Sequence, residues 1–286
     1  MEQMEQLATG YTLIEGPVWD PDRGLLFSDV HDGGVYCISP DGAVSTAVEH
    51  RRGIGGMALH EAGGLVVGGR NVAYKGPARE STTVLLERET VADIIGFNDL
   101  TTDSAGRIYA GSLGGSPFAA GGISGTGFLH MIDVDGTSRV LSDGVKLTNG
   151  LGFSPDGATL YHCDSRSDTI RAYSVNNDGT VGAWRTFAQV GKGVPDGLAV
   201  AEDGSIWVAI ARGDCVRVWD ADGTEREPIA CPLHMPTSVC FGGADLRDLY
   251  IVTGSEGTDS DHGGTVFRMR VDVPGLPLTP ARVRLN

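Results

Sequence analysis

Apolar and polar positions alternate in short runs along this chain, and the runs recur in a common frame. The segments LTNGLGFSPDG, from Leu147 to Gly157, and VPDGLAVAEDG, from Val194 to Gly204, both place a polar residue before Gly-Leu. A small residue, an apolar residue and a closing Asp-Gly then follow. Short runs of this kind between glycine-containing turns are typical of β-strands joined into hairpins. The pattern therefore predicts a chain made mostly of short strands.

This frame occurs six times. The copies begin at Glu15, Gly55, Asn98, Asn149, Asp196 and Thr237. Each is followed by a turn and a β-rich run such as GRIYAGS or SIWVAIA, and in four of them a further strand such as GFLHMIDVDG is easy to see. A period of about 40–50 residues with four short strands per repeat is typical of a β-propeller blade.

The sequence therefore predicts an all-β fold, a six-bladed β-propeller with a central channel, which spans residues 1–286 as a single domain. A pair of β-sandwiches is the competing fold, but it does not account for six copies of one phrase. We expect residues 1–14 and the tail ARVRLN to pair and close the ring, because closure removes an open sheet edge.

The amino-acid composition and net charge limit the classes of protein and of binding partner that fit this chain. Forty-three glycines with 7% aromatic residues fit an all-β chain, and a net charge of −15 repels nucleic acid. No run approaches the roughly 18 apolar residues of a membrane span, and MEQMEQLATG has neither a basic nor an apolar signal region. Five scattered cysteines without a Cys-x-x-Cys pair indicate reduced, buried thiols. We expect a cytoplasmic protein with a small-molecule partner; the oligomeric state stays open.

The residue that heads each copy is expected at one mouth of the channel. Glu15, Asn98, Asn149 and Asp196 offer carboxylate or amide oxygens at this position. Converging carboxylates repel one another unless a cation balances them, and calcium prefers several oxygen ligands. Calcium is our first choice, with magnesium or manganese as alternatives and zinc less favoured without nitrogen or sulfur donors. The competing interpretation, a turn residue before glycine, fits Asn and Asp but not Glu15.

The chain resembles the gluconolactonase, senescence marker protein and luciferin-regenerating enzyme family. The resemblance covers nearly the whole chain and rests on EGPVWD, FNDLTTDSAGRIYAGSL, TNGLGFSPDGATLYHCDS, PDGLAVAEDGSIWVA and GGTVFRM. It implies a six-bladed propeller with one divalent metal ion, with Glu15, Asn149 and Asp196 as ligands. It also implies that Asn98 ligates the ion or holds a substrate oxygen. Characterised relatives mostly hydrolyse lactones.

One position departs from the family pattern. Sugar-lactone members tend to carry an arginine two residues before the asparagine that matches Asn98, and this chain has Gly96 there. We therefore expect a lactone other than a simple aldonolactone. Phe97 and the segment 114–127 indicate a less polar or more open pocket, and Arg70 or Arg166 is an alternative source of positive charge.

The resulting hypothesis is a metal-dependent lactonase, a carboxylic-ester hydrolase. Asp196 is the candidate general base for the attacking water, although a nucleophilic or purely electrostatic role stays open. Asn98 would orient the substrate, with Phe97 and Arg70 beside it. Two alternatives remain. The same metal site could serve phosphotriester hydrolysis or a lyase or isomerase step, or the chain could be a non-enzymatic calcium-binding propeller.

Overall fold

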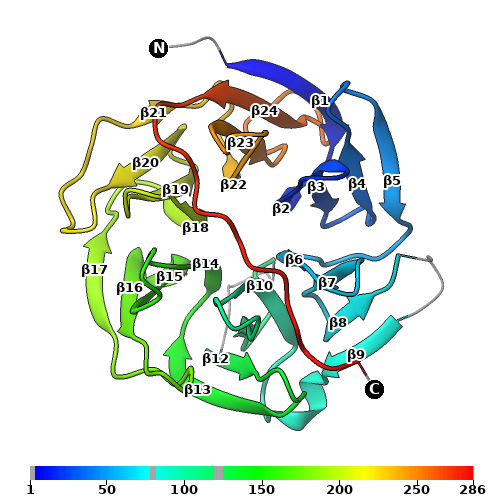
Figure 1. The fold of residues 1–286 in the computed structure, drawn as a ribbon. Helices are drawn as coiled ribbons and strands as arrows, with labels where there is room; N and C mark the ends of the chain where they lie inside the picture. The colour runs from blue at the N-terminus through cyan, green and yellow to red at the C-terminus, as the bar shows by residue number, and fades with distance from the viewer. Residues whose placement is uncertain (1–3, 78–81, 119–124, 286) are drawn as a thin grey trace. The chain divides into compact units, whose positions relative to one another are not determined.

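The computed structural model describes residues 4–77, 82–118 and 125–285. These residues form six four-stranded antiparallel sheets, which correspond to the six predicted blades (Figure 1). The chain divides into two compact units of three sheets each. Unit 1 comprises Met1–Ile54 and Val190–Pro277, and unit 2 comprises Gly55–Gln189 and Leu278–Asn286. The prediction that residues 1–286 form a single domain stays a prediction.

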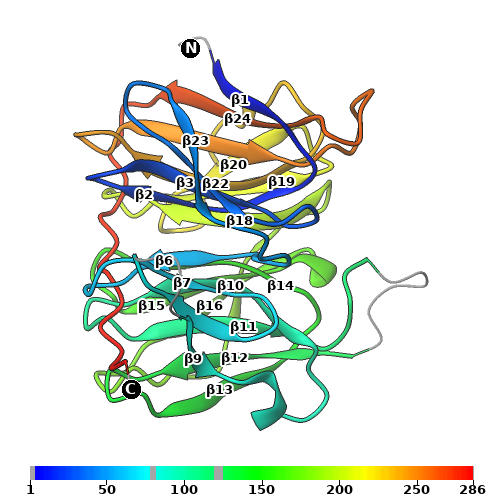
Figure 2. The same cartoon turned by 90° about the vertical axis from the view of Figure 1, so that its right-hand side faces the viewer.

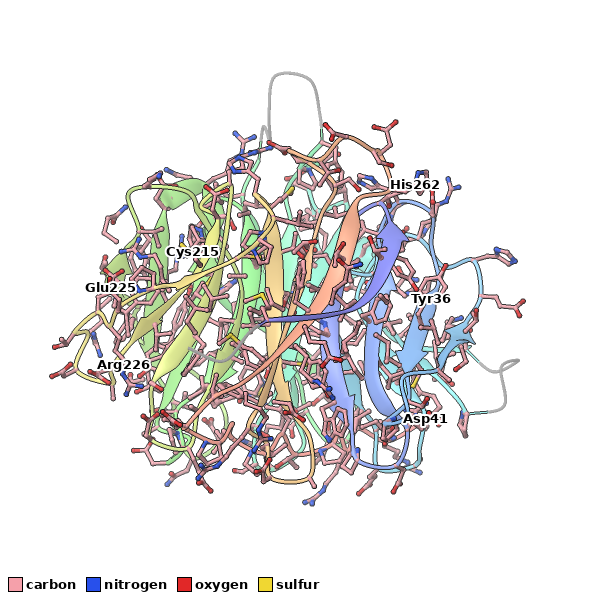
Figure 3. The ribbon with its side chains drawn as sticks, turned by 90° about the horizontal axis from the view of Figure 1, so that it is seen from above. Tyr36, Asp41, Cys215, Glu225, Arg226 and His262 are labelled. Atoms are coloured by element: carbon pink, nitrogen blue, oxygen red, sulfur yellow. The ribbon has the colours of Figure 1, made fainter. Side chains whose placement is uncertain are left out.

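Unit 1 holds the sheets β2-β3-β4-β5, β18-β19-β20-β21 and β22-β23-β24-β1. The strands of unit 1 are β1 (Glu5–Tyr11), β2 (Ile14–Asp20), β3 (Gly24–Asp29), β4 (Val35–Ile38), β5 (Val44–Val48), β18 (Val194–Val200), β19 (Ile206–Ala211), β20 (Cys215–Trp219), β21 (Ile229–Ala230), β22 (Pro236–Gly242), β23 (Asp248–Thr253) and β24 (Gly264–Arg270). Figure 3 shows His262, which lies between β23 and β24, and Asp41, which lies between β4 and β5, at opposite ends of these sheets.

Unit 2 holds the sheets β6-β7-β8-β9, β10-β11-β12-β13 and β14-β15-β16-β17. Its strands are β6 (Met57–Leu59), β7 (Leu65–Val67), β8 (Val72–Lys75), β9 (Thr82–Leu86), β10 (Gly96–Thr102), β11 (Ile108–Leu113), β12 (Gly127–Ile132), β13 (Ser138–Val145), β14 (Thr148–Phe153), β15 (Thr159–Asp164), β16 (Thr169–Ser174) and β17 (Arg185–Gln189). The helices among the described residues are the 3-10 turns η1 (Arg88–Thr90) and η2 (Ser165–Ser167). No described helix is long and apolar enough to cross a membrane.

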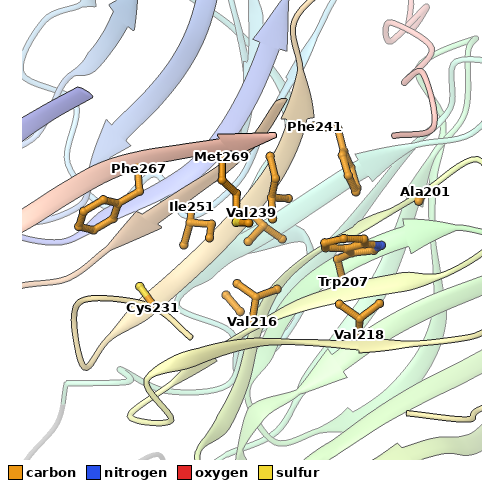
Figure 4. Close-up of a cluster of buried hydrophobic side chains, with 12 residues drawn as sticks. Ala201, Trp207, Val216, Val218, Cys231, Val239, Phe241, Ile251, Phe267 and Met269 are labelled. Carbon is orange, nitrogen blue, oxygen red and sulfur yellow. The ribbon is translucent and has the colours of Figure 1, made fainter. Parts of the chain in front are cut away.

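The cores form where neighbouring sheets face one another, because each sheet buries one face against the next. In unit 1, Trp207 of β19 meets Phe241 of β22 edge-on, with ring centroids 5.4 Å apart (Figure 4). Four cysteines are buried and Cys215 is partly exposed, and all five are free thiols. The expected burial therefore holds for all but Cys215, and all but Cys231, which follows β21, lie in strands.

Among the described residues, 4–14 and the tail 281–285 do not pair with one another, which corrects the expected ring closure. The strand β1 completes the sheet of β22, β23 and β24 (Figure 2), so the N-terminal segment does cover a sheet edge. The tail instead belongs to unit 2, where Ala281 bridges His60 and Val283 accepts a hydrogen bond from the His60 ring at 2.9 Å. Burial of Ala281 and Val283 in a hydrophobic cluster of unit 2 explains this placement.

Candidate metal and substrate site

Five of the six residues that head the repeated phrases lie at irregularities of a strand, and the sixth, Gly55, lies just before β6 (Met57–Leu59). A β-bulge sets two residues opposite one and re-aims the side chains, and bulges are frequent beside active sites. The register breaks between Glu15 and Val18 in β2, Phe97 and Leu100 in β10, Thr148 and Leu151 in β14, Pro195 and Leu198 in β18, and Pro236 and Ser238 in β22. The shared bulge is thus the structural reason for the repeated phrase.

Two of the four predicted ligands meet within unit 2. The Nδ2 group of Asn98 donates hydrogen bonds to Oδ1 of Asn149 at 2.5 Å and to the backbone oxygen of Thr148 at 2.8 Å. The Nδ2 group of Asn149 donates to the hydroxyl oxygen of Ser165 at 2.8 Å. Because these N–H groups are committed to protein acceptors, the carbonyl oxygen is the atom that each amide can offer to a cation or a substrate, and that of Asn149 also accepts the bond from Asn98. These oxygens fit a calcium site.

The segment that carries Asn149 is tied to a buried ion pair. The Asp164 carboxylate accepts hydrogen bonds from the backbone N–H groups of Lys146 and Leu147, and it accepts one from Arg171 at 2.5 Å. The Arg171 and Asp164 side chains are 4% and 0% exposed. The Ser165 amide in turn donates to the Leu147 carbonyl at 2.9 Å. The start of β14 and the Ser165 hydroxyl are therefore held together.

Two of the six equivalent positions have structural roles. An ideal Cβ on Gly55 would lie 1.9 Å from Oδ1 of Asn98, so the Asn98 side chain occupies the space of a side chain there. The Thr237 hydroxyl donates to the Ile14 carbonyl at 2.5 Å and thereby joins β22 to β2. These contacts explain why Gly55 and Thr237 carry no carboxylate or amide group.

The other two predicted ligands lie in unit 1. Glu15 of β2 is half-buried, and Asp196 of β18 is 6% exposed. Both strands pack against β22. Gly197, the residue after Asp196, is approached by Ser238 so closely that an ideal Cβ would lie 1.9 Å from its hydroxyl oxygen. Unit 1 thus holds the two predicted carboxylate ligands, and unit 2 holds the two predicted amide ligands. The prediction that these four residues share one metal ion stays a prediction.

In the described part of the chain, no group of three or more aspartate, glutamate, histidine or cysteine side chains is placed so that it could hold a metal ion. The predicted set contains only two such residues, Glu15 and Asp196, and its other two members are asparagines. Its chemistry is that of hard oxygen donors, which suits calcium, magnesium or manganese better than zinc.

The structure gives a physical reason for the glycine at position 96. An ideal Cβ there would lie 2.7 Å from the Gly69 carbonyl oxygen, and Gly69 pairs with Phe97 through two backbone hydrogen bonds of 2.6 and 2.9 Å. An arginine at position 96 therefore requires a shift of this backbone. Arg70 follows Gly69, is exposed, and pairs with Glu89 at 3.1 Å. Arg166 is exposed on η2.

The Phe97 side chain is 1% exposed and packs in the core of unit 2. Its ring lies edge-on to the His130 ring, with centroids 5.3 Å apart, so the structure gives this residue a packing role. Within the segment 114–127, residues 119–124 lie outside the described residues. The proposed openness of the pocket at that segment stays a prediction.

Sequence reasoning missed two groups beside Asn98 and Asn149. One is Ser165, which holds the Asn149 amide. The other is Asp99, which shares the bulge of Asn98 and whose pKa is raised to about 7 by burial. A signal for Asp99 was present, since four of the other five phrases place glycine at this position. No comparable signal marks Ser165, because its partner is 16 residues away.

The chain is similar to known proteins over nearly its whole length. A profile of the SMP-30/Gluconolactonase/LRE-like region matches residues 13–255. The pentonolactonase XacC of Haloferax volcanii is 32% identical, over 97% of this chain and 97% of its own length. The 6-deoxy-6-sulfogluconolactonase of Pseudomonas putida is 35% identical, over 92% of each chain.

A solved structure extends the comparison to the fold. The structure of a calcium-binding protein, regucalcin, from Agrobacterium tumefaciens has a TM-score of 0.86 at 20% identity, and the match covers 99% of this chain and 98% of that chain. With the six four-stranded sheets, this likeness confirms the predicted six-bladed β-propeller.

Proposed function

Because this chain belongs to the SMP-30/gluconolactonase/LRE-like family, we propose that it is a metal-dependent lactonase that opens a cyclic ester of a small molecule. Two relatives that are 32% and 35% identical carry lactonase names, one for a pentonolactone and one for a sulfonated gluconolactone. Both matches extend over more than nine tenths of this chain, so the proposal concerns the chain as a whole.

The orientation of the Asn98 and Asn149 amides is the observation that carries the metal site. The Asn98 N–H groups donate to the Thr148 carbonyl oxygen and to Asn149 Oδ1, and the Asn149 amide donates to Ser165, so carbonyl oxygens are the atoms proposed to ligate the ion. We assign Glu15 and Asp196 as the two carboxylate ligands. Two negative charges balance one divalent cation, and calcium is the ion that this set of hard oxygen donors favours.

When bound, the cation supplies Lewis-acid polarisation of the lactone carbonyl group. In this proposal Asn98 holds a substrate oxygen and orients the ring, and Glu15 and Asn149 hold the cation in place. Asp196 takes a proton from the attacking water as that water adds to the carbonyl carbon. The proton passes to the ring oxygen as the ester bond breaks, so that the product is a hydroxy acid.

We further propose that the substrate is not a simple aldonolactone. The Gly69 carbonyl lies 2.7 Å from the place of a Cβ at position 96, so this chain lacks the room for the arginine that the sugar-lactone pattern carries there. Hydroxyl groups that such an arginine would bind have no partner from this position. The substrate would therefore be substituted differently from a plain aldonic acid lactone.

The test is ester-ring hydrolysis by purified protein, followed as acid release over sugar, aliphatic and aromatic lactones. Each lactone is assayed after chelation and again after calcium, manganese or zinc is restored. We expect turnover that disappears on chelation and returns with calcium. Asn149→Ala should weaken calcium binding and turnover, whereas Asn176→Ala, which removes an exposed amide in the same unit, should leave both unchanged.

Three results would contradict the proposal. Tight stoichiometric calcium binding without turnover of any lactone would favour a non-enzymatic calcium-binding propeller. Metal-dependent hydrolysis of a phosphotriester, but of no lactone, would assign the site to other chemistry, as would a lyase or isomerase reaction. Turnover that is equal before and after chelation would remove the metal from the mechanism. Preference for simple aldonolactones would overturn only the substrate assignment.

A further inference from the structure

An arginine in a strained turn lies beside one of the proposed catalytic residues. The turn between β19 and β20 contains Arg212 and Asp214, whose φ angles of 59° and 57° fall in the left-handed region. A long side chain seldom adopts this conformation, and a non-glycine residue held there is a reason to look for function. The turn is held by a hydrogen bond of 2.8 Å between Asp214 and the His234 ring.

The register of the β18–β19 hairpin places Arg212 at the end of the sheet where β18, the strand that carries Asp196, begins. Val194 pairs with Ala211 and Pro195 with Ile210, so Arg212 follows the last pair and Asp196 lies in the bulge next to these pairs. The Glu256 carboxylate, and less strongly the Asp196 carboxylate, raise the pKa of Arg212. The guanidinium group is thus close enough to Asp196 for their charges to interact.

Glu256 holds this guanidinium group in a fixed direction. Glu256 lies between β23 and β24, in the next sheet of unit 1 (Figure 1). Its two carboxylate oxygens accept hydrogen bonds from Nε and Nη2 of Arg212 at 2.6 and 2.7 Å. A guanidinium group has five N–H donors, so this fork leaves the Nη1 donors for another acceptor. The Arg212 side chain is 57% exposed and therefore open to a ligand.

We infer that Arg212 is a substrate-contact residue that donates hydrogen bonds to a hydroxyl substituent of the lactone, away from the reacting carbonyl group. This inference rests on the proposed lactonase function and identifies the substrate as a hydroxylated lactone. An arginine has no acceptor atom, so its partner must be an oxygen acceptor. The Glu256 carboxylate binds the guanidinium group and the Asp196 carboxylate is near enough to interact with it, which disfavours an anionic substituent and favours a neutral hydroxyl group.

The proposed contact of Arg212 is independent of position 96. The two positions belong to different units, since Gly96 begins β10 in unit 2 and Arg212 follows β19 in unit 1. A hydroxyl contact made from the β19–β20 turn does not depend on the space that the Gly69 carbonyl closes at position 96. The proposed hydroxyl contact is thus made from the β19–β20 turn rather than from position 96.

The test compares two probe lactones that share one ring, γ-butyrolactone and its dihydroxylated counterpart erythronolactone. Erythronolactone is used as a small hydroxylated probe and not as the proposed substrate. In Arg212→Gln we expect KM for erythronolactone to rise roughly 10- to 100-fold, the effect of one hydrogen bond to a charged group, while γ-butyrolactone kinetics stay the same. Arg270→Gln is the matched control, because Arg270 makes a similar fork with Asp245 at the other end of the sheet that holds Glu256. Arg270→Gln should leave KM unchanged for both lactones.

Two further measurements do not depend on turnover. Calcium affinity, measured calorimetrically, should be equal or higher in Arg212→Gln, because a positive charge near Asp196 is removed. Arg212→Gly should raise the thermal midpoint, since glycine relieves the left-handed strain, and should still bind erythronolactone more weakly than the wild type. If Arg212 had only a structural role, its replacement would not be expected to raise the thermal midpoint while weakening erythronolactone binding.

Equal KM changes for both lactones would overturn the inference and leave the lactonase proposal standing. If the protein opens neither probe lactone, calorimetric binding of erythronolactone decides the role of Arg212, whereas failure to open any lactone of the wider panel would contradict the proposed function. Equal erythronolactone affinity in the wild type and Arg212→Gln would overturn the inference in that case as well. A lower thermal midpoint in Arg212→Gly would contradict the strain argument.

Discussion

The Asn98 amide donates a hydrogen bond to the carbonyl oxygen of Asn149, at 2.5 Å, between the first strands of two neighbouring sheets of unit 2. The Ser165 hydroxyl accepts from the other end of the Asn149 amide, at 2.8 Å. The three side chains form a directed chain of hydrogen bonds, which determines which atom of each amide is available. In a site made of oxygen donors, this orientation decides whether a cation meets an oxygen or an N–H group.

Ser165→Ala should weaken calcium binding without unfolding the protein. Loss of the hydroxyl acceptor frees the Asn149 amide to turn, and loss of a residue that orients a metal ligand typically costs roughly 10- to 100-fold in metal affinity. Calorimetric titration with calcium measures this effect. Ser165→Thr, which keeps the hydroxyl group, is the matched control. Unchanged affinity in the alanine variant would show that Ser165 does not orient Asn149.

Asp196→Ala should abolish turnover and weaken calcium binding, because it removes both the proposed base and a carboxylate ligand. Asp196→Asn separates these roles, since the amide keeps a ligating oxygen but cannot take a proton. We expect the asparagine variant to bind calcium detectably while its kcat falls roughly 10²- to 10⁴-fold, the usual contribution of a general base. Near-normal activity in either variant would refute the assignment.

Gly96→Arg should destabilise the protein rather than restore a sugar-lactone pattern. The Cβ would lie 2.7 Å from the Gly69 carbonyl oxygen, and overpacking of this kind typically costs about 1–3 kcal/mol. Chemical denaturation measures the free energy of unfolding, and Gly96→Ala tests the Cβ alone. A fully stable Gly96→Arg variant that gains aldonolactone turnover would show instead that the Gly69 backbone yields easily.

The protein should lose stability in mild acid because of buried histidines. His130 is 1% exposed, and burial lowers its pKa from 6.5 to about 4. The unfolded chain therefore binds more protons than the folded chain between these values, so the free energy of unfolding falls as the pH drops from 6.5 towards 4. His162, whose pKa burial lowers to about 3, acts in the same direction.

Urea denaturation at several pH values checks this dependence. His130→Gln should show a slope that is shallower by up to about 1.4 kcal/mol per pH unit, the effect of one proton. Carboxylates that titrate in the same range affect the wild type and the variant alike, so the difference isolates the histidine. Parallel pH profiles would mean that His130 does not carry this dependence.

The strand pattern and the repeated phrase were sufficient to predict six four-stranded sheets, because alternation and turn chemistry are local. The closure of the fold was predicted only in part. The strand β1 does complete a sheet, but its partner is β24, whereas the tail lies against His60 in unit 2. The pairing of distant segments depends on where their apolar residues become buried, and Ala281 and Val283 are buried in a hydrophobic cluster of unit 2.

By itself the sequence determined the blades, the family resemblance and the oxygen-bearing positions Glu15, Asn98, Asn149 and Asp196, since these depend on residue type and spacing. Tertiary structure decided what spacing does not encode. It showed that the Gly69 carbonyl closes position 96, that Ser165 orients Asn149, and that Glu256 directs Arg212. Each of these contacts joins residues brought together only by strand register and sheet packing, and the energies involved depend on atomic distance rather than on separation along the chain.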